Sequence, residues 1–451
     1  MEGGLGAPVR NPHGLDRPDY LDEADFELEA RRVFDICHGC RRCFNLCGSF
    51  PRLFDLVDSC ETGEVDGVVA SDFGKVMDAC TLCDMCFMAA CPYVPPHEFN
   101  LDFPHLVVRY RAIQNSKGFG SFIDRELAKT DRNGRLARPI WRLVNWLTGT
   151  GNRISRLILE WLASIHREAN LPKYFSGKFS GRNEAGVLPT NTGAPAFGRK
   201  VVIFSTCFVT YNNPRICKLF RQVLALNGVE SEIVYPGCCG MPQLERGDLG
   251  AVSANAHRIT RELAGWIEKG YSVVALVPSC ALMLKFEWPL ILPEDPTVRL
   301  VSANTADLSE YIVDIAKNEG LGVELESLNE DVTLQLACHS RAQNMGIKGA
   351  EMLRLIPGLD LTIVERCSGH GGLWGVKQAN FDTAIKTGRA AARQVMQKGS
   401  LFVASECPLA CDHLRQGIEK LNPGAQPQSK FGHPLELFAK ACGIEEVSRE
   451  P

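Results

Sequence analysis

The chain has 451 residues, of which 45% are hydrophobic and 23% are charged, and its formal net charge is −4 at pH 7. This composition is that of a globular protein with room for about three or four domains, and it excludes wholesale disorder. A slightly acidic chain offers no basic field, so nucleic acid is not expected as a partner. No apolar run is long enough to span a bilayer, and the first residues lack the apolar segment of a secretory signal. We therefore expect a cytoplasmic protein.

The N-terminal half is predicted to contain four regions. Residues 1–25 are rich in Gly, Pro and Asp and are expected to form a flexible tail. A cysteine-rich region at 26–112 is followed by a helical segment at 113–170. Residues 171–199 are rich in Gly, Pro, Ser and Asn, which is typical of a linker.

The helical segment carries apolar stripes at helical spacing, broken by Thr-Gly-Thr-Gly at 148–151. Trp141, Trp146 and Trp161 lie on these stripes, with several arginines beside them. An amphipathic helix of this kind either packs on a neighbouring domain or lies in a membrane interface. Packing is the commoner role and is the favoured interpretation here.

Two α/β modules are predicted after the linker, at 200–325 and 326–448, because short apolar runs alternate with helical stretches. In the first module the runs and helices fall at 201–207, 214–227, 231–240, 250–269 and 272–280. The same order returns in the second module at 332–340, 346–356, 361–369, 376–398 and 400–407. The predicted strands of both modules end in cysteines, at the sheet edge where open α/β folds bind ligands.

Cysteine is the outlier of the composition, with nineteen residues that are bunched rather than dispersed. Cytosolic thiols stay reduced, so metal or redox chemistry is a better expectation than a disulfide framework. Two motifs lie in the cysteine-rich region: C-x2-C-x2-C-x3-C is formed by Cys37, Cys40, Cys43 and Cys47, and C-x2-C-x2-C-x4-C by Cys80, Cys83, Cys86 and Cys91.

Cysteines at steps of three let one tight loop present three thiolates to a cluster, and in two-cluster ferredoxins the trailing cysteine serves the other cluster. The hypothesis is therefore a helical, tandem ferredoxin-type domain with two [4Fe–4S] clusters. One cluster would use Cys37, Cys40, Cys43 and Cys91, and the other would use Cys80, Cys83, Cys86 and Cys47. Structural zinc is the alternative, but zinc sites usually use two separated C-x2-C knuckles.

A second constellation spans the two α/β modules. Its first set is Cys207, Cys238, Cys239 and Cys280, and its second is Cys338, Cys367, Cys407 and Cys411. The cores PGCCGMPQ and ERCSGHGGLWG resemble those of cysteine-rich CCG-domain iron–sulfur oxidoreductases, a family that includes the iron–sulfur subunit of anaerobic glycerol-3-phosphate dehydrogenase and relatives of heterodisulfide reductase. The resemblance covers residues 30 to about 445 in the family order of tandem clusters, helical segment and two modules.

The resemblance implies one or two further iron–sulfur clusters, held by these two sets of four cysteines. This sequence departs from the family pattern at Met283 and Ser368, where cysteines would stand, and Cys407 and Cys411 are one residue further apart than usual. Four thiolates suffice for an ordinary cubane, whereas the family's disulfide-cleaving clusters use a fuller set. The departures therefore favour electron relay over heterodisulfide reduction. Cys60, Cys217 and Cys442 lie outside every motif and are expected to be ordinary buried thiols.

The expected function is that of an electron-transfer subunit. No G-x-G-x-x-G follows a predicted strand, so substrate oxidation is expected on a partner flavoprotein dehydrogenase or another redox protein. The resemblance adds a quinone or membrane-anchored acceptor, and with it a peripheral place on the cytoplasmic face of the membrane. The alternatives are a heterodisulfide or thiol reductase acting at a CCG-module cluster, and a zinc-binding scaffold without redox chemistry.

Overall fold

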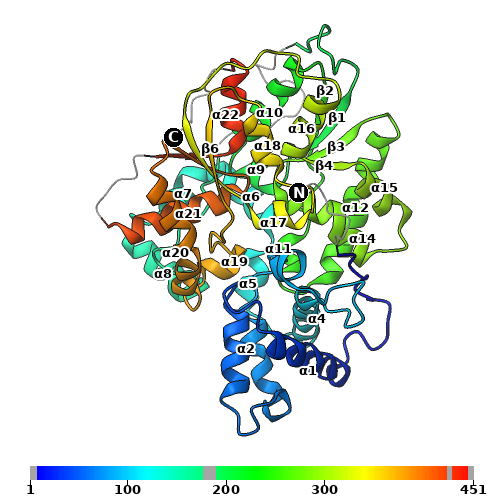
Figure 1. Cartoon of the computed structure of the whole chain (residues 1–451), viewed down its shortest axis with the longest axis vertical. Helices are drawn as coiled ribbons and strands as arrows, with labels where there is room; N and C mark the ends of the chain where they lie inside the picture. Colours follow the sequence, from blue (N-terminus) through cyan, green and yellow to red (C-terminus); the bar gives the residue numbers. More distant parts are fainter. Residues whose placement is uncertain (1–7, 176–188, 424–428, 445–451) are drawn as a thin grey trace.

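The computed structural model describes residues 8–175, 189–423 and 429–444. Most of the predicted linker core, 176–188, lies outside the described residues. Helices cover the N-terminal third, and two four-stranded parallel sheets with their helices make up the rest (Figure 1). The α/β part of the prediction is confirmed, whereas a ferredoxin-type fold for the N-terminal region stays a prediction.

The N-terminal region is helical and projects from one end of the molecule (Figure 1). Its helices are α1 (Glu23–Cys40), α2 (Ser49–Asp58), α3 (Phe73–Met77) and α4 (Phe103–Ser116). Asp22 caps α1 by accepting a hydrogen bond from the backbone of Asp25, and Arg41 ends it in the left-handed conformation. Phe34, Phe50 and Phe103 pack together, so an aromatic core holds the helices beside the cysteine loops.

The first sheet has the strand order β2-β1-β3-β4. Its strands are β1 (Lys200–Phe204), β2 (Glu230–Val234), β3 (Ser272–Ala275) and β4 (Thr305–Asp307). Its helices are α9 (Cys207–Tyr211), α10 (Arg215–Leu226), α11 (Met241–Leu244), α12 (Leu249–Ile267), α13 (Pro278–Leu282), α14 (Trp288–Ile291), α15 (Pro296–Ala303) and α16 (Leu308–Asn318). The central strand β1 is fully buried from Val201 onward, as expected for a parallel strand covered on both faces.

The second sheet repeats this order as β6-β5-β7-β8. Its strands are β5 (Asp331–Gln335), β6 (Asp360–Val364), β7 (Phe402–Ser405) and β8 (Lys430–Gly432). Its helices are α17 (Cys338–Ala342), α18 (Lys348–Arg354), α19 (Gly372–Val376), α20 (Phe381–Lys398), α21 (Pro408–Leu421) and α22 (Pro434–Ala441). The prediction that the second module copies the first is confirmed at the level of topology.

The two modules pack through equivalent helices. Helix α10 of the first contacts α22 of the second, and α18 of the second contacts α16 of the first. Helices α10 and α18 hold equivalent positions in the two modules, and so do α16 and α22. The two contacts therefore pair the same two positions in opposite order, as a pseudo-twofold relation requires. Helices α13 and α17 also meet, and each carries a cysteine. The packing therefore brings the cysteine edges of the two sheets together.

The helical segment forms α5 (Phe122–Leu127), α6 (Thr130–Ala137), α7 (Trp141–Thr148) and α8 (Arg153–Ala163). Ala163 and Leu159 of α8 pack with Phe381 of α20, but the apolar stripes face outward. Trp146 is 63% exposed and Trp161 is 80% exposed. The interpretation that these stripes pack on a neighbouring domain is therefore wrong, because α8 packs through its other side. None of the described helices combines the length and apolar character needed to cross a bilayer.

Residues 8–22 are the described part of the expected flexible tail, but contacts with distant segments hold them in place. Arg10 forms ion pairs with carboxylates of three distant segments, and His13 and Tyr20 are buried. Arg109 of α4 donates hydrogen bonds to the backbone carbonyls of Asp19 and Tyr20. Composition suggested flexibility, but these long-range polar contacts hold the segment against the helices. We call residues 8–22 the strap.

Candidate functional site

Four groups of cysteines form the candidate site. Site A contains Cys37, Cys40, Cys43 and Cys91, which line one pocket of about 280 Å³ between the end of α1 and the Cys91 turn. Burial raises the pKa of the Cys37 thiol, and the neighbouring thiolates of Cys91, Cys43 and Cys40 raise it further. The structure therefore brings the trailing cysteine of the second motif to the loop of the first, as the cross-ligation hypothesis requires.

Site B contains Cys47, Cys80, Cys83 and Cys86. Burial raises the pKa of Cys86, and the thiolates of Cys83, Cys80 and Cys47 add to this shift. Leu82 and Asp84 on either side of Cys83 have positive φ angles of 49° and 62°. Such left-handed residues curl the loop around the site, and the backbone N–H of Leu82 points to Sγ of Cys80 at 3.4 Å.

The extra residue before Cys91 has a structural explanation. Residues Cys86–Ala90 form one π-helical turn, closed by a hydrogen bond of 2.8 Å from the backbone N–H of Cys91 to the carbonyl of Cys86. A π turn holds one residue more than an α turn. The insertion is absorbed there, so Cys86 still faces site B and Cys91 still reaches site A.

Site C contains Cys207, Cys238, Cys239 and Cys280, which follow β1, β2 and β3 at the carboxyl edge of the first sheet. Sγ of Cys239 lies 3.3 Å from Sγ of Cys280. Hydrogen bonds from Cys207 and Cys239 hold the pKa of the Cys238 thiol well below its ordinary value. A thiolate in a buried sulfur cluster is the state that binds metal.

Site D contains Cys338, Cys367 and Cys407, which follow β5, β6 and β7. Burial raises the pKa of Cys338, and the neighbouring thiolates of Cys367 and Cys407 raise it further. Gly369 has φ +82°, and a Cβ there would collide with the backbone of Ala384. Only glycine fits this turn, whose N–H points to Sγ of Cys367 at 3.3 Å.

Cys411 departs from the predicted set of the second module. It lies one turn into α21, and its Sγ faces the carbonyl oxygens of Val403 (3.8 Å) and Gly432 (3.7 Å) in the sheet. Burial raises the pKa of Cys411, and of the predicted set the Cys407 thiolate contributes to this shift. Cys407 caps the start of α21, so the helix turns Cys411 toward β7 and β8.

The sulfur spacing allows a test of which metal group the sites fit. A tetrahedral zinc ion with Zn–S bonds of about 2.3 Å would hold its sulfurs about 3.8 Å apart. Among the described residues, which include all nineteen cysteines, no three cysteine sulfurs lie within 4.8 Å of one another. Apart from site C, where Sγ of Cys239 and Cys280 lie 3.3 Å apart, all-thiol groups at this wider spacing suit an iron–sulfur cluster better than a single zinc ion.

The four sites adjoin one another. Site A adjoins site B, because desolvation and then the thiolates of Cys91 (site A) and Cys47 (site B) raise the pKa of half-buried Cys43 to about 12. Site B adjoins site D, because the side chain of His339, the neighbour of Cys338, lies 3.1 Å from the carbonyl of Leu82, the neighbour of Cys83. Desolvation raises the pKa of Cys83, and the thiolates of Cys338 and Cys367 raise it further.

His339 connects site D to site C. Its Nδ1 lies 2.8 Å from Oγ of Ser279, the neighbour of Cys280, and its Nε2 lies 3.1 Å from the carbonyl of Leu82, the neighbour of Cys83. The side chain is buried between loops that carry cysteines of three sites. In the sequence, His339 is recognisable only as the neighbour of Cys338, and that position does not distinguish a contact between sites from ordinary packing or exposure.

Comparison with known proteins agrees with this geometry. The cysteine-rich domain family called CCG matches residues 201–285, which carry all four cysteines of site C. The chain is 28% identical to one subunit of the anaerobic glycerol-3-phosphate dehydrogenase of Escherichia coli K12, over 70% of this chain and 76% of that protein. It is 26% identical to one subunit of the fumarate reductase (CoM/CoB) of Methanothermobacter marburgensis, over 54% and 47% of the two chains. It is also 25% identical to an uncharacterised iron–sulfur protein of Methanocaldococcus jannaschii, over 49% and 42%.

The chain therefore contains a cysteine-rich CCG domain at residues 201–285 and is homologous to iron–sulfur proteins. Its homologues include subunits of a dehydrogenase and of a reductase, which supports a role in electron transfer. The matched CCG domain ends near Met283, the residue that stands in place of a cysteine, and Met283 is fully buried. A thioether cannot become a thiolate, so site C has four thiols and no fifth.

One contact to the CCG site could not be foreseen from the cysteine motifs. The first turn of α6 covers site C, where the Asp131 carboxylate accepts a hydrogen bond of 2.7 Å from the backbone N–H of Cys238. The sequence gives little indication of this contact, because Thr130 and Asp131 are residues that commonly begin a helix. Thr130, in the same turn, also helps to lower the pKa of the Cys238 thiol.

Proposed function

We propose that the chain relays single electrons along sites A, B, D and C, between a partner flavoprotein dehydrogenase and a quinone acceptor. The contact of site B with site D supports this proposal most directly, because it joins the N-terminal cysteine motifs to the CCG modules. [4Fe–4S] clusters bound at these sites would supply one-electron chemistry. Sites A and B would each hold one cluster with four cysteines, and site C a third.

The protein's own contribution is to bury the thiols and to direct backbone N–H groups at them. The N–H groups of Leu82 and Gly369 point to sulfurs of sites B and D. Hydrogen bonds to cysteine sulfur and exclusion of water are the two means by which a protein sets a cluster's potential. The relay through site D requires a cluster that would have three cysteine ligands there.

A stopped-flow experiment tests the relay. Anaerobic protein reduced with dithionite and mixed with a water-soluble naphthoquinone is expected to be reoxidised at all its clusters, followed by absorbance near 400 nm. A heterodisulfide offered with the same artificial donor should not be consumed. Disulfide turnover by the isolated chain, or reduced clusters that the quinone leaves unchanged, would contradict the proposal.

We further propose that the exposed face of α7 and α8 docks on an anionic membrane surface, where a quinone resides. Trp146 and Trp161 stand outward among exposed leucines and isoleucines, and Arg142 and Arg153 are exposed beside them. Arginine with tryptophan on an amphipathic helix favours an anionic lipid interface over an apolar protein surface. Arg156 is different, because it is buried and donates to the backbone carbonyls of residues 148, 166, 167 and 169.

The double variant Trp146→Glu, Trp161→Glu is expected to bind phosphatidylglycerol-containing vesicles at least about tenfold more weakly. The two substitutions remove both aromatic anchors and place negative charges against anionic lipid. Sedimentation with the vesicles measures the bound fraction. Val69→Glu, which alters an exposed apolar residue of the N-terminal region, should bind like the wild type. Wild-type protein that stays unbound, or a double variant that binds equally well, would remove the membrane role and leave a protein partner for this face.

A further inference from the structure

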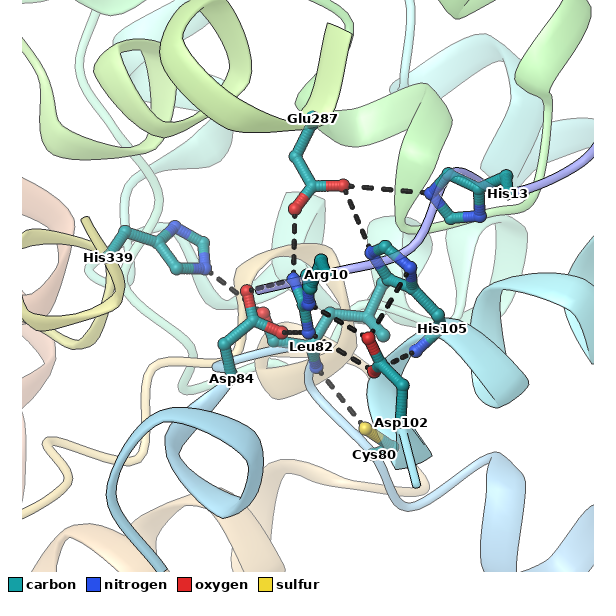
Figure 2. A network of polar contacts seen from close by, with 9 residues as sticks. All are labelled: Arg10, His13, Cys80, Leu82, Asp84, Asp102, His105, Glu287 and His339. Carbon is teal, nitrogen blue, oxygen red and sulfur yellow. Dashed lines mark hydrogen bonds and ion pairs between the residues drawn. The ribbon is translucent and has the colours of Figure 1, made fainter. Parts of the chain in front are cut away.

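A buried polar network joins the strap, α4 and the turn Met283–Glu287 of the first CCG module (Figure 2). Arg10 lies at its centre and forms ion pairs with Asp84 (2.7 Å), Asp102 (3.0 Å) and Glu287 (3.1 Å). The guanidinium also lies over the ring of Phe87, 4.4 Å from its centroid. None of these side chains belongs to the cysteine sites.

Three potential metal-ligand atoms converge on one side of this network. Nε2 of His13 lies 3.8 Å from Oε2 of Glu287, and Nε2 of His105 lies 3.6 Å from the same oxygen. Both separations are too long for hydrogen bonds. The three atoms lie within 4.8 Å of one another, and none of them has a hydrogen-bond partner within the described part of the chain.

These unpartnered atoms are deeply buried, since the side chains of His13 and Glu287 are only 1% and 3% exposed. A polar atom left without a partner at such depth loses its hydration without compensation, so a partner is expected there. The two imidazole rings stack with centroids 3.9 Å apart, which places both Nε2 atoms toward the Glu287 carboxylate (Figure 2).

The remaining atoms of the three side chains are already held. Nδ1 of His13 faces the hydroxyl of Tyr20 at 3.5 Å, and Nδ1 of His105 faces the Asp102 carboxylate at 3.5 Å. Oε1 of Glu287 accepts from Arg10. Metal-binding histidines are typically oriented in this way, with the second ring nitrogen on a carboxylate or another oxygen.

The charges of the network also favour a cation. Asp84, Asp102 and Glu287 bring three negative charges, and Arg10 brings one positive charge. Burial lowers the pKa of His13 to about 4, so this ring is neutral at pH 7. A divalent ion would balance the excess of two negative charges.

We propose that His13, His105 and Glu287 bind a divalent transition-metal ion, of the zinc class, at a site separate from the iron–sulfur sites. Two histidines and one glutamate form a ligand set that zinc uses in proteins, with bonds of about 2.0–2.2 Å. Tetrahedral ligands at that distance stand about 3.3–3.5 Å apart, so the two N···O separations need to close by only a few tenths of an ångström. The ion would fasten the strap to α4 and to the first CCG module.

Zinc binding to the anaerobically purified full-length protein tests this proposal. After incubation with zinc and gel filtration, the wild type is expected to retain about one zinc per chain, measured with iron by mass spectrometry. The zinc X-ray absorption edge should show nitrogen and oxygen neighbours and no sulfur at about 2.3 Å. Glu287→Gln, which keeps the side-chain shape, and His13→Ala should each lose this zinc while iron content stays unchanged.

His257→Ala is the matched control, because His257 is an exposed histidine of α12 that pairs with Asp295. This variant should retain zinc like the wild type. A wild type that retains no zinc, retention that is equal in Glu287→Gln, or sulfur ligands in the absorption spectrum would each overturn the proposal. Unchanged iron in the variants distinguishes loss of this ion from loss of the fold.

Discussion

Replacing Cys83 with alanine is expected to disconnect the N-terminal clusters from the CCG modules. Cys83 is a half-buried thiol of site B, and after desolvation the thiolates of Cys338 and Cys367 in site D contribute to the rise in its pKa. Loss of this ligand should remove the site B cluster and about four irons per chain. A donor that reaches only site A should then reduce the CCG-module clusters far more slowly than in the wild type, because a step of the route is missing.

Freeze-quenched EPR during this reduction measures the order in which the clusters gain electrons. Cys442→Ala is the control, since Cys442 is a partly buried thiol outside all four sites. It should keep the wild-type iron content and rate. If Cys83→Ala lost its iron but filled the CCG-module clusters at the wild-type rate, site B would not be on the route.

Cys238→Ala is expected to remove the cluster of site C and leave the signals of sites A and B intact. Cys238 is buried, hydrogen bonds from Cys207 and Cys239 lower the pKa of its thiol, and its backbone N–H donates to the Asp131 carboxylate. Removing one of four ligands at such a site should cost about four irons per chain. Iron and acid-labile sulfide measured together check this result.

Cys411→Ala provides the matched comparison, because Cys411 is an equally buried cysteine of the other CCG module. Its thiol faces carbonyl oxygens of β7 and β8. Iron should therefore stay at the wild-type level in this variant. Loss of a cluster from Cys411→Ala would show that Cys411 ligates after all, and full iron in Cys238→Ala would remove site C.

The sequence predicted the sheets well because each signal was local. A run such as VVIF is apolar on both faces, which only a covered parallel strand satisfies, and the cysteine after it marks the carboxyl edge. The short edge strands β4 and β8 were missed, since three residues with little apolar character carry no periodic signal.

Other features depended on contacts between distant segments. Spacing placed Cys411 near Cys407 along the chain, but only the packing of α21 on the sheet decides which way each thiol points. The strap was expected to be flexible because of its glycines and prolines. The partners of Arg10 lie 74 to 277 residues away, so the sequence alone could not reveal the contacts that hold the strap. The sequence predicted the apolar stripes of α7 and α8 but not their exposure to solvent. Hydrophobic periodicity identifies an apolar helix face, and it does not indicate what packs against that face.

Anaerobic counting of iron and acid-labile sulfide, combined with EPR of the reduced protein, tests the central claim most directly. The cysteine sites predict brown protein with about twelve to sixteen irons per chain and an equal amount of sulfide. About eight irons would confine clusters to sites A and B and leave the CCG modules without metal. Colourless protein whose nineteen cysteines titrate as free thiols, or bind zinc through sulfur, would contradict the account.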